Sequence, residues 1–204
     1  MASVYRVSRR ATRTTMKSVG IQLLVTLVAV LTAAGLFAAR GLPPTESIHT
    51  YACSGDVNGV QRTLNWGADV NAKDDLFGST PLDTAAVFGH KEVAELLIAK
   101  GANVNAKDAA AGCTPLHGAA YNDWEDVAEF LITHGAEINA KDKEGRTPLH
   151  WAVSEDRKDM AELLIARGAD ANAKDKDGQT PLQLAVSRNY QDIPDLLRQH
   201  GAKE

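Results

Sequence analysis

A four-residue string that recurs at an almost constant step restricts the fold of this chain more than any other feature. The string reads Thr80-Pro81-Leu82-Asp83, and its later copies start at Thr114, Thr147 and Thr180. The steps between copies are therefore 34, 33 and 33 residues. A period of this length is typical of a solenoid, in which each copy is one small unit that packs against its neighbours.

A second string sets the boundaries of the copies. It begins at Gly67 and recurs from Gly101, Gly135 and Gly168, and in each complete copy it starts 21 residues after the threonine. Counting the same distance back from Gly67 reaches Glu46, where a degenerate first copy begins. We therefore predict five repeats, which cover about residues 46–78, 79–112, 113–145, 146–178 and 179–204.

Each copy has the residue pattern of two short helices. Thr80 suits the N-cap of the first helix, and the proline after it suits the first helical turn, where a missing N–H costs nothing. The second helix has one apolar face, formed by Val93, Leu96 and Leu97 at helical spacing. Gly101 then provides a left-handed C-cap. The residues between this glycine and the next threonine predict an extended, turn-rich finger.

The turn between the two helices offers an internal check on this register. Twelve residues before each terminal glycine, the five copies have Gly55, Gly89, Asp123, Asp156 and Asn189. Glycine, asparagine and aspartate are the residues that most readily adopt a positive φ. We expect a left-handed residue at each of these positions.

The chain resembles the ankyrin repeat, whose Thr-Pro-Leu-His signature and 33-residue period match residues 46–204. The resemblance implies an all-α solenoid of five helix-turn-helix repeats with hairpin fingers. It also implies that His117 and His150, which recur at one repeat position, bond locally between helix and finger. Because packed helices lie about 8–10 Å apart, one histidine per repeat cannot surround a metal ion.

The first forty residues differ sharply from the rest in charge. They contain six basic side chains and no acidic one, whereas the other 164 residues contain 16 basic and 26 acidic side chains. Residues 19–39 are uncharged and long enough to span a bilayer as a helix. We predict a basic cytoplasmic segment at 1–18, a transmembrane signal anchor at 19–39, a linker at 40–45 and the repeat domain at 46–204.

The positive-inside rule keeps such an N-terminus in the cytoplasm and places the repeats across the membrane. A bacterial envelope protein with its repeats in the periplasm fits this topology best. The alternative is a cleaved signal peptide, which would leave a secreted or periplasmic soluble protein.

The composition and motifs also exclude several classes of function. An acidic repeat domain would be repelled by phosphate backbones, so we expect no nucleic-acid partner. The chain has no Gly-x-Ser-x-Gly elbow, phosphate-binding glycine loop or His-Glu-x-x-His motif. We expect no enzyme, cofactor or small-molecule substrate. One alternative of another class is a metal-binding or enzymatic accessory protein that uses His49 and Cys53, four residues apart on one helix.

The two cysteines, Cys53 and Cys113, lie two repeats apart in the sequence. Two stacking steps separate them by about 20 Å, too far for a disulfide. We predict that both are unpaired.

The resemblance implies that fingertips and the ends of the first helices form a concave binding face. At these positions the N-terminal half of the face is apolar and aromatic and the C-terminal half is polar, which indicates a protein partner that is recruited or inhibited. The candidate binding residues are Leu76, Phe77, Val87, Phe88, Tyr121, Asn122, Trp124, Glu155 and Arg188. An alternative is that Phe88 and Tyr121 pack onto neighbouring repeats. We expect Trp151 to pack between repeats.

Overall fold

The computed structural model describes residues 44–203, which belong to one compact unit. The predicted membrane segment at 19–39 lies outside these residues. Within the described part of the chain, no helix is long and apolar enough to cross a membrane.

Residues 44–203 form ten α-helices in five pairs, with no strand among them. The pairs are α2 (Ile48–Ser54) with α3 (Val57–Asn65), α4 (Pro81–Phe88) with α5 (Lys91–Ala99), α6 (Pro115–Asn122) with α7 (Glu125–Thr133), α8 (Pro148–Ser154) with α9 (Lys158–Ala166), and α10 (Pro181–Ser187) with α11 (Asp192–Gln199). The predicted five-repeat, all-α architecture is confirmed.

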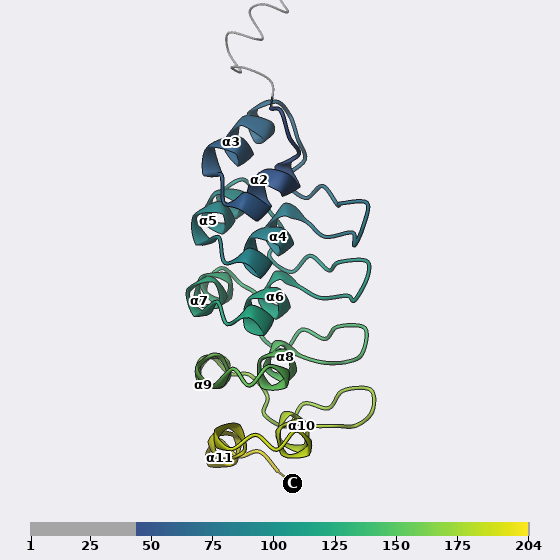
Figure 1. The fold of residues 1–204 in the computed structure, drawn as a ribbon, viewed down its shortest axis with the longest axis vertical. Helices are drawn as coiled ribbons and strands as arrows, with labels where there is room; N and C mark the ends of the chain where they lie inside the picture. The colour runs from purple at the N-terminus through teal and green to yellow at the C-terminus, as the bar shows by residue number, and fades with distance from the viewer. Residues whose placement is uncertain (1–43, 204) are drawn as a thin grey trace, which may run out of the picture. The chain divides into compact units, whose positions relative to one another are not determined.

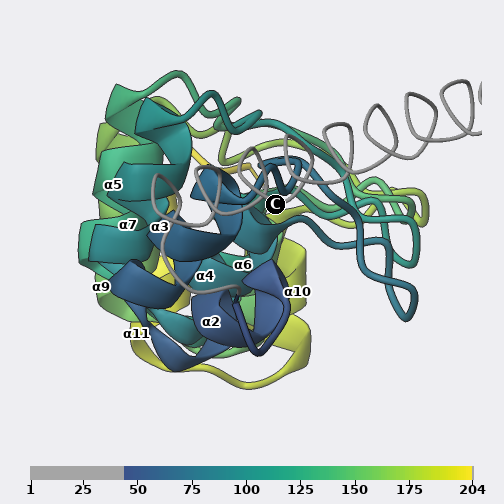
Figure 2. The ribbon, with the colours of Figure 1, turned by 90° about the horizontal axis from the view of Figure 1, so that it is seen from above.

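The helices of the repeat unit form two layers (Figure 1). The first helices of the pairs stack beside the fingers, and the second helices stack on the other side of the first helices, away from the fingers. Seen along the stack, the fingers project together to one side of the first helices (Figure 2). This arrangement places the fingers and the first helices around a common face.

Each of the four later repeats begins with the predicted cap. The backbone N–H of Thr80 donates to Asp83 Oδ2 at 2.7 Å, and the N–H of Asp83 donates to Thr80 Oγ1 at 3.2 Å. This reciprocal capping box satisfies donors that the first helical turn leaves unpaired. The same box recurs with other side chains at the fourth position, namely His117, His150 and Gln183.

The five predicted turn residues all have positive φ. The values are 74° at Gly55 and Gly89, 67° at Asp123, and 57° at Asp156 and Asn189. The prediction from the sequence register is therefore confirmed at every copy.

Leucines at equivalent positions form the core of the stack. In the four later repeats, the first helices bury Leu82, Leu116, Leu149 and Leu182 completely. The second helices bury Leu97, Leu131, Leu164 and Leu197 completely. Removing such a side chain from water contributes about 2 kcal/mol, so the stacking of repeats is the main source of stability. The small alanines between the leucines let adjacent helices approach closely.

Side chains of the second string join each finger to the next. Asn105 Oδ1 accepts from the N–H of Glu137 at 2.8 Å, and Asn105 Nδ2 donates to Gly135 O at 3.0 Å. Equivalent bonds are made by Asn71, Asn139 and Asn172. Three lysines add a parallel ladder, since Lys73, Lys107 and Lys141 each donate to the backbone carbonyl one repeat further on. These bonds explain why Asn and Lys recur in the string.

Candidate protein-binding groove

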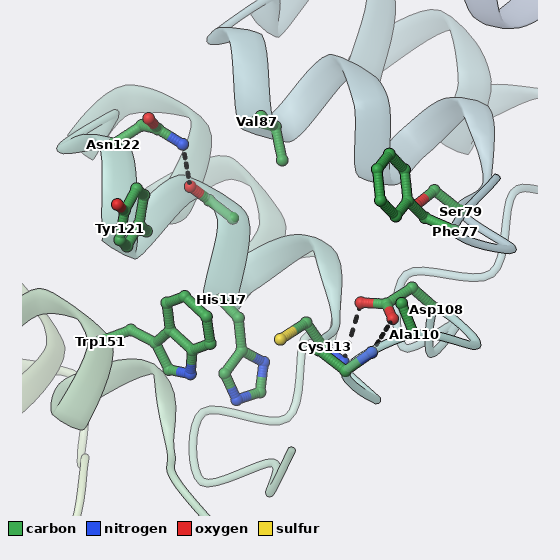
Figure 3. A pocket seen from close by; sticks show the side chains of 12 residues that line it. Phe77, Ser79, Val87, Asp108, Ala110, Cys113, His117, Tyr121, Asn122 and Trp151 are labelled. Carbon is green, nitrogen blue, oxygen red and sulfur yellow. Dashed lines mark hydrogen bonds between the residues drawn. The ribbon is translucent and has the colours of Figure 1, made fainter. Parts of the chain in front are cut away.

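The face between fingers and first helices contains a hollow with a volume of about 360 Å³. We call this hollow the main pocket. In Figure 3, Phe77 stands on one side of it, Tyr121 and Trp151 stand on the other, and Val87 lies between them. The remaining lining residues are Ser79, Asp108, Ala110, Ala111, Cys113, His117, Gly118 and Asn122.

The finger wall of the main pocket is positioned by an aspartate. The backbone N–H groups of Leu76 and Phe77 donate to Asp74 Oδ1 at 2.8 and 2.7 Å. The bond from the Phe77 N–H is the largest of the effects that hold the pKa of Asp74 below its usual value. Phe77 O in turn accepts from the N–H of Ala109 in the next finger at 2.9 Å. Phe77 is 59% exposed although these hydrogen bonds hold its backbone.

The opposite wall is a cluster of aromatic and charged side chains. The rings of Tyr121 and Trp151 meet edge to face, with centroids 5.4 Å apart. Trp151 Nε1 donates to Asp142 Oδ2 at 2.9 Å, and the guanidinium of Arg146 lies 4.6 Å from the Trp151 ring centroid. Edge-to-face and cation–π contacts of this kind restrict ring motion. This wall is therefore preorganised.

Two titratable side chains that line the main pocket, His117 and Cys113, are neutral at pH 7. Burial lowers the pKa of His117 to about 4 and raises the pKa of the Cys113 thiol to about 12. The N–H of Thr114 donates to His117 Nδ1 at 3.1 Å, which leaves the proton on Nε2 facing Arg146 O at 3.2 Å. His117 therefore has the local structural role that the resemblance implies, and His150 makes the equivalent bonds.

A glycine gives the pocket its depth. Gly118 lies on α6 where the other complete repeats have Thr84, Trp151 and Leu184. A Cβ atom at Gly118 would lie only 2.7 Å from Val87 Cγ2. A larger residue would displace Val87 and fill the space between α4 and α6.

A smaller hollow of about 270 Å³ adjoins the main pocket. We call it the side pocket. It shares Phe77, Ser79 and Val87 with the main pocket, and its other lining residues are Asp74, Asp83, Thr84 and Phe88. We call the two pockets together the groove.

Five of the nine candidate residues line the groove. Phe77, Val87, Tyr121 and Asn122 line the main pocket, and Phe88 lines the side pocket. Phe88 and Tyr121 are 49% and 38% exposed, although the Tyr121 ring also packs on Trp151 of the next repeat. The predicted face is therefore hollowed where these five candidate residues lie.

The other four candidates line neither pocket. Leu76 is 84% exposed at the fingertip, Glu155 is half-buried, and Arg188 donates to Ser154 O. Trp124 is 40% exposed, but its Nε1 donates to Val87 O at 2.9 Å, and its ring covers Gly89.

The contact of Trp124 belongs to a series that joins successive repeats. At the equivalent positions His90 bonds to Cys53 O at 2.9 Å, and Tyr190 donates to Ser154 O at 2.9 Å. Trp124 therefore stabilises the stack, whatever its exposed edge binds.

Sequence reasoning missed Trp151 as a groove residue. It is half-buried and packs on its neighbours as expected, but one side of it forms the pocket wall. Its place next to Gly118 at the same repeat position was the available signal, because a small residue beside a large one leaves a hollow. Cys113 and the finger alanines were missed because their exposure depends on neighbouring repeats.

The alternative metal site at His49 and Cys53 is not supported. His49 Nε2 lies 3.1 Å from both Ala72 O and Ser79 O, so this nitrogen carries the proton and has no lone pair for a metal. His49 is the structural histidine of the first repeat. No group of three or more potential metal ligands occurs within residues 44–203. Cys53 and Cys113 are both unpaired, as predicted.

Comparison with known proteins agrees with the geometry. No curated protein matches the chain. A family model described as ankyrin repeats (3 copies) matches residues 48–142, 109–175 and 125–204, which together exceed half of the chain. Ankyrin repeats are a protein–protein interaction module. On the combined evidence of the repeats, the caps, the fingers and this match, the chain belongs to the ankyrin repeat family.

Proposed function

We propose that this protein is a non-catalytic adaptor that recruits or inhibits one protein partner through the groove. The observation that carries the proposal is the gathering of exposed apolar side chains around the groove. Seven large apolar side chains are exposed in the described part of the chain, and four of them, Phe77, Val87, Phe88 and Tyr121, line the groove. Soluble proteins rarely leave such a patch in water unless a partner covers it.

The architecture of the groove favours a protein ligand. Large aromatic side chains dominate interface energetics, and here they surround a pocket in which the Cys113 thiol is kept protonated by its raised pKa. Another exposed apolar residue, Val186, has a different explanation. It occupies the position of the buried Ala86, Ala120 and Val153, and no later described repeat covers it.

We further propose that residues 19–39 tether the protein to a membrane, with the repeats on the extracytoplasmic side. The uncharged run and the basic residues before it support this topology. The alternative is release of a soluble binder after cleavage. The intact mass of the mature protein distinguishes them, because a tethered protein retains residues 1–41 and a released one lacks them.

Crosslinking in native membranes tests the adaptor function. A photoreactive amino acid at position 77 should capture one protein, and the same group at Val186 should not. Combined Phe77→Asp and Tyr121→Asp substitutions should abolish the interaction, whereas Val186→Asp should leave it intact. Both variants must first show the helical circular dichroism of the wild type. Equal capture by the two variants would show that the groove is not the binding surface.

A further inference from the structure

The charge of the groove identifies a second chemical feature of its ligand. The carboxylates that line the two pockets are Asp74, Asp83 and Asp108, and no lysine or arginine lines either pocket. His117 is neutral at pH 7 because of its lowered pKa. Among residues 44–203, none of these three carboxylates has a basic side chain within ion-pair distance.

The next repeat shows how the chain neutralises such a charge when it supplies its own cation. Asp142 is equivalent to Asp74 and Asp108, and Arg146 Nε pairs with its Oδ2 at 3.1 Å. Trp151 adds a second donor to the same oxygen. The N-terminal half of the groove lacks this compensation, although its carboxylates occupy the same region of each finger.

Two of the three groove carboxylates are each held by three backbone N–H groups. The carboxylate of Asp74 accepts three backbone N–H groups of its finger, from Leu76, Phe77 and Ser79. The carboxylate of Asp108 likewise accepts three N–H groups of the next finger. Their charge is solvated by the backbone, so they need no further partner.

Asp83 is different. Its side chain is in the first turn of α4, where α6 and α8 have His117 and His150, and it is only 7% exposed. Oδ2 takes both hydrogen bonds that Asp83 accepts, from the N–H and the hydroxyl of Thr80. Oδ1 accepts none from the described residues. Burial of a carboxylate without an ion pair is costly, and it raises the pKa of Asp83 to about 6. The charge of Lys73 acts on Asp83 only from beyond ion-pair distance and lowers this pKa less than burial raises it. It is still mainly ionised at pH 7.

We propose that the groove binds an extended protein segment in which a large apolar side chain lies close to a lysine or arginine that pairs with Asp83. This inference rests on the proposed function and specifies the ligand of the same groove. The apolar side chain fills the main pocket between Phe77 and Tyr121, and the basic one enters the side pocket. Because the pockets share Phe77, Ser79 and Val87, both side chains come from neighbouring positions of one segment.

The side pocket suits a long basic side chain. Its apolar walls, Val87 and Phe88, can cover the methylene groups of lysine or arginine while the charged end reaches the carboxylate. A pair between such a group and a largely buried carboxylate is worth more than a pair in water.

A peptide library against the immobilised full-length protein tests this specificity. The probe is a set of acetylated, amidated octapeptides with one fixed tryptophan and randomised neighbouring positions. We expect lysine or arginine to be selected at one position near the tryptophan. Replacing that lysine by norleucine, which keeps the length and removes the charge, should weaken binding about tenfold or more.

Two variants at Asp83 assign the preference to this carboxylate. Asp83→Asn and Asp83→His should both lose the selection for a basic residue and keep the binding of the tryptophan. Asp83→His guards against misfolding, because histidine is present at the same position of two other repeats. The matched control is Asp75→Asn, which removes the same charge from an exposed finger residue that lines neither pocket. It should retain the preference.

The outcomes of these experiments distinguish a failure of the Asp83 proposal from a failure of the proposed adaptor function. Tryptophan-dependent binding without a basic preference, or a basic preference that survives both Asp83 substitutions, overturns the role of Asp83 alone. If no peptide is selected, or if Phe77→Asp with Tyr121→Asp selects the same peptides, the groove itself is not a binding site and both proposals fail.

Discussion

Replacing Asp83 with histidine should make the folded chain more stable at pH 8 and less stable near pH 4. At the equivalent positions, His117 and His150 accept the capping threonine N–H through Nδ1 and face a carbonyl of the next finger through Nε2. At position 83 the corresponding carbonyl is that of Cys113, the residue before the next capping threonine. The substitution therefore adds one hydrogen bond between repeats, which contributes about 1 kcal/mol.

The carboxylate that is lost is unfavourable at pH 8. Burial raises the pKa of Asp83 from its ordinary value of 3.8 to about 6. This difference corresponds to about 3 kcal/mol between the two protonation states. Because the folded pKa is the higher one, the stability contributed by Asp83 is fully present below pH 3.8 and is lost as the pH rises through about 6. Removing the carboxylate and adding the hydrogen bond should increase the free energy of unfolding at pH 8 by up to about 4 kcal/mol.

The new imidazole titrates in the opposite sense. Burial lowers the pKa of His117 from 6.5 to about 4, so its contribution is present above pH 6.5 and is lost as the pH falls through about 4. This difference also corresponds to about 3 kcal/mol. Near pH 4 the wild type has regained the stability that protonated Asp83 contributes. The variant has instead lost the stability that its additional neutral, buried histidine contributed. The gain at pH 8 should therefore reverse.

Urea unfolding followed by far-ultraviolet circular dichroism at pH 8, 6 and 4 measures these free energies. Asp83→Asn is the control, because an amide still accepts from Thr80 and does not titrate. It should be more stable than the wild type at pH 8 and should lack the additional acid sensitivity of the histidine variant. A difference between Asp83→His and wild type that stays the same from pH 8 to pH 4 would refute this reasoning.

Three further predictions concern the stack and its thiols. Asn105→Ala removes two hydrogen bonds between fingers and should lower the free energy of unfolding by about 2 kcal/mol, whereas the exposed Asn58→Ala should change it by less than about 0.5 kcal/mol in the same urea titration. Asp156 has a φ of 57°, which a β-branched residue adopts only with strain, so Asp156→Val should lower the thermal midpoint of unfolding by the equivalent of about 1–2 kcal/mol. Asp156→Gly should not lower it, and equal midpoints for the two variants would contradict this prediction. At pH 7.5 a disulfide reagent should modify the exposed Cys53 well before Cys113, because the Cys113 thiol is partly buried and has a pKa of about 12. Mass spectrometry of peptides from samples quenched at early times measures the order of modification, and earlier modification of Cys113 would contradict the prediction.

Much of the helical architecture could be predicted because its causes are local. Thr80 caps α4 through atoms three residues away, and the residue that turns the chain between helices must tolerate a positive φ. Asp123 satisfies that requirement without being a glycine, so the turn was recognisable from residue type and register alone. Because the pattern recurs with a constant period, each local prediction made for one repeat applies to the other repeats as well.

The candidate site was predictable only in outline. Residue type and repeat position indicated that Phe77 and Tyr121 would be exposed, since a solvated face has no need of aromatic side chains. The same reasoning could not separate Trp124, whose indole covers the turn of the preceding repeat, from a free aromatic residue. It also could not identify Trp151 as a pocket wall, because that role depends on the missing side chain at Gly118 in another helix.

The sequence by itself determined the repeat number, the helix pairs, the caps and the apolar character of the N-terminal half of the face. Each depends on interactions within one repeat or on its simple recurrence. Only the tertiary structure decided that Phe77, Val87, Tyr121 and Trp151 enclose one pocket, and that Asp83 is buried beside it without an ion pair. These features arise where four successive repeats meet, and contacts between residues so far apart in the chain depend on the packing of whole repeats.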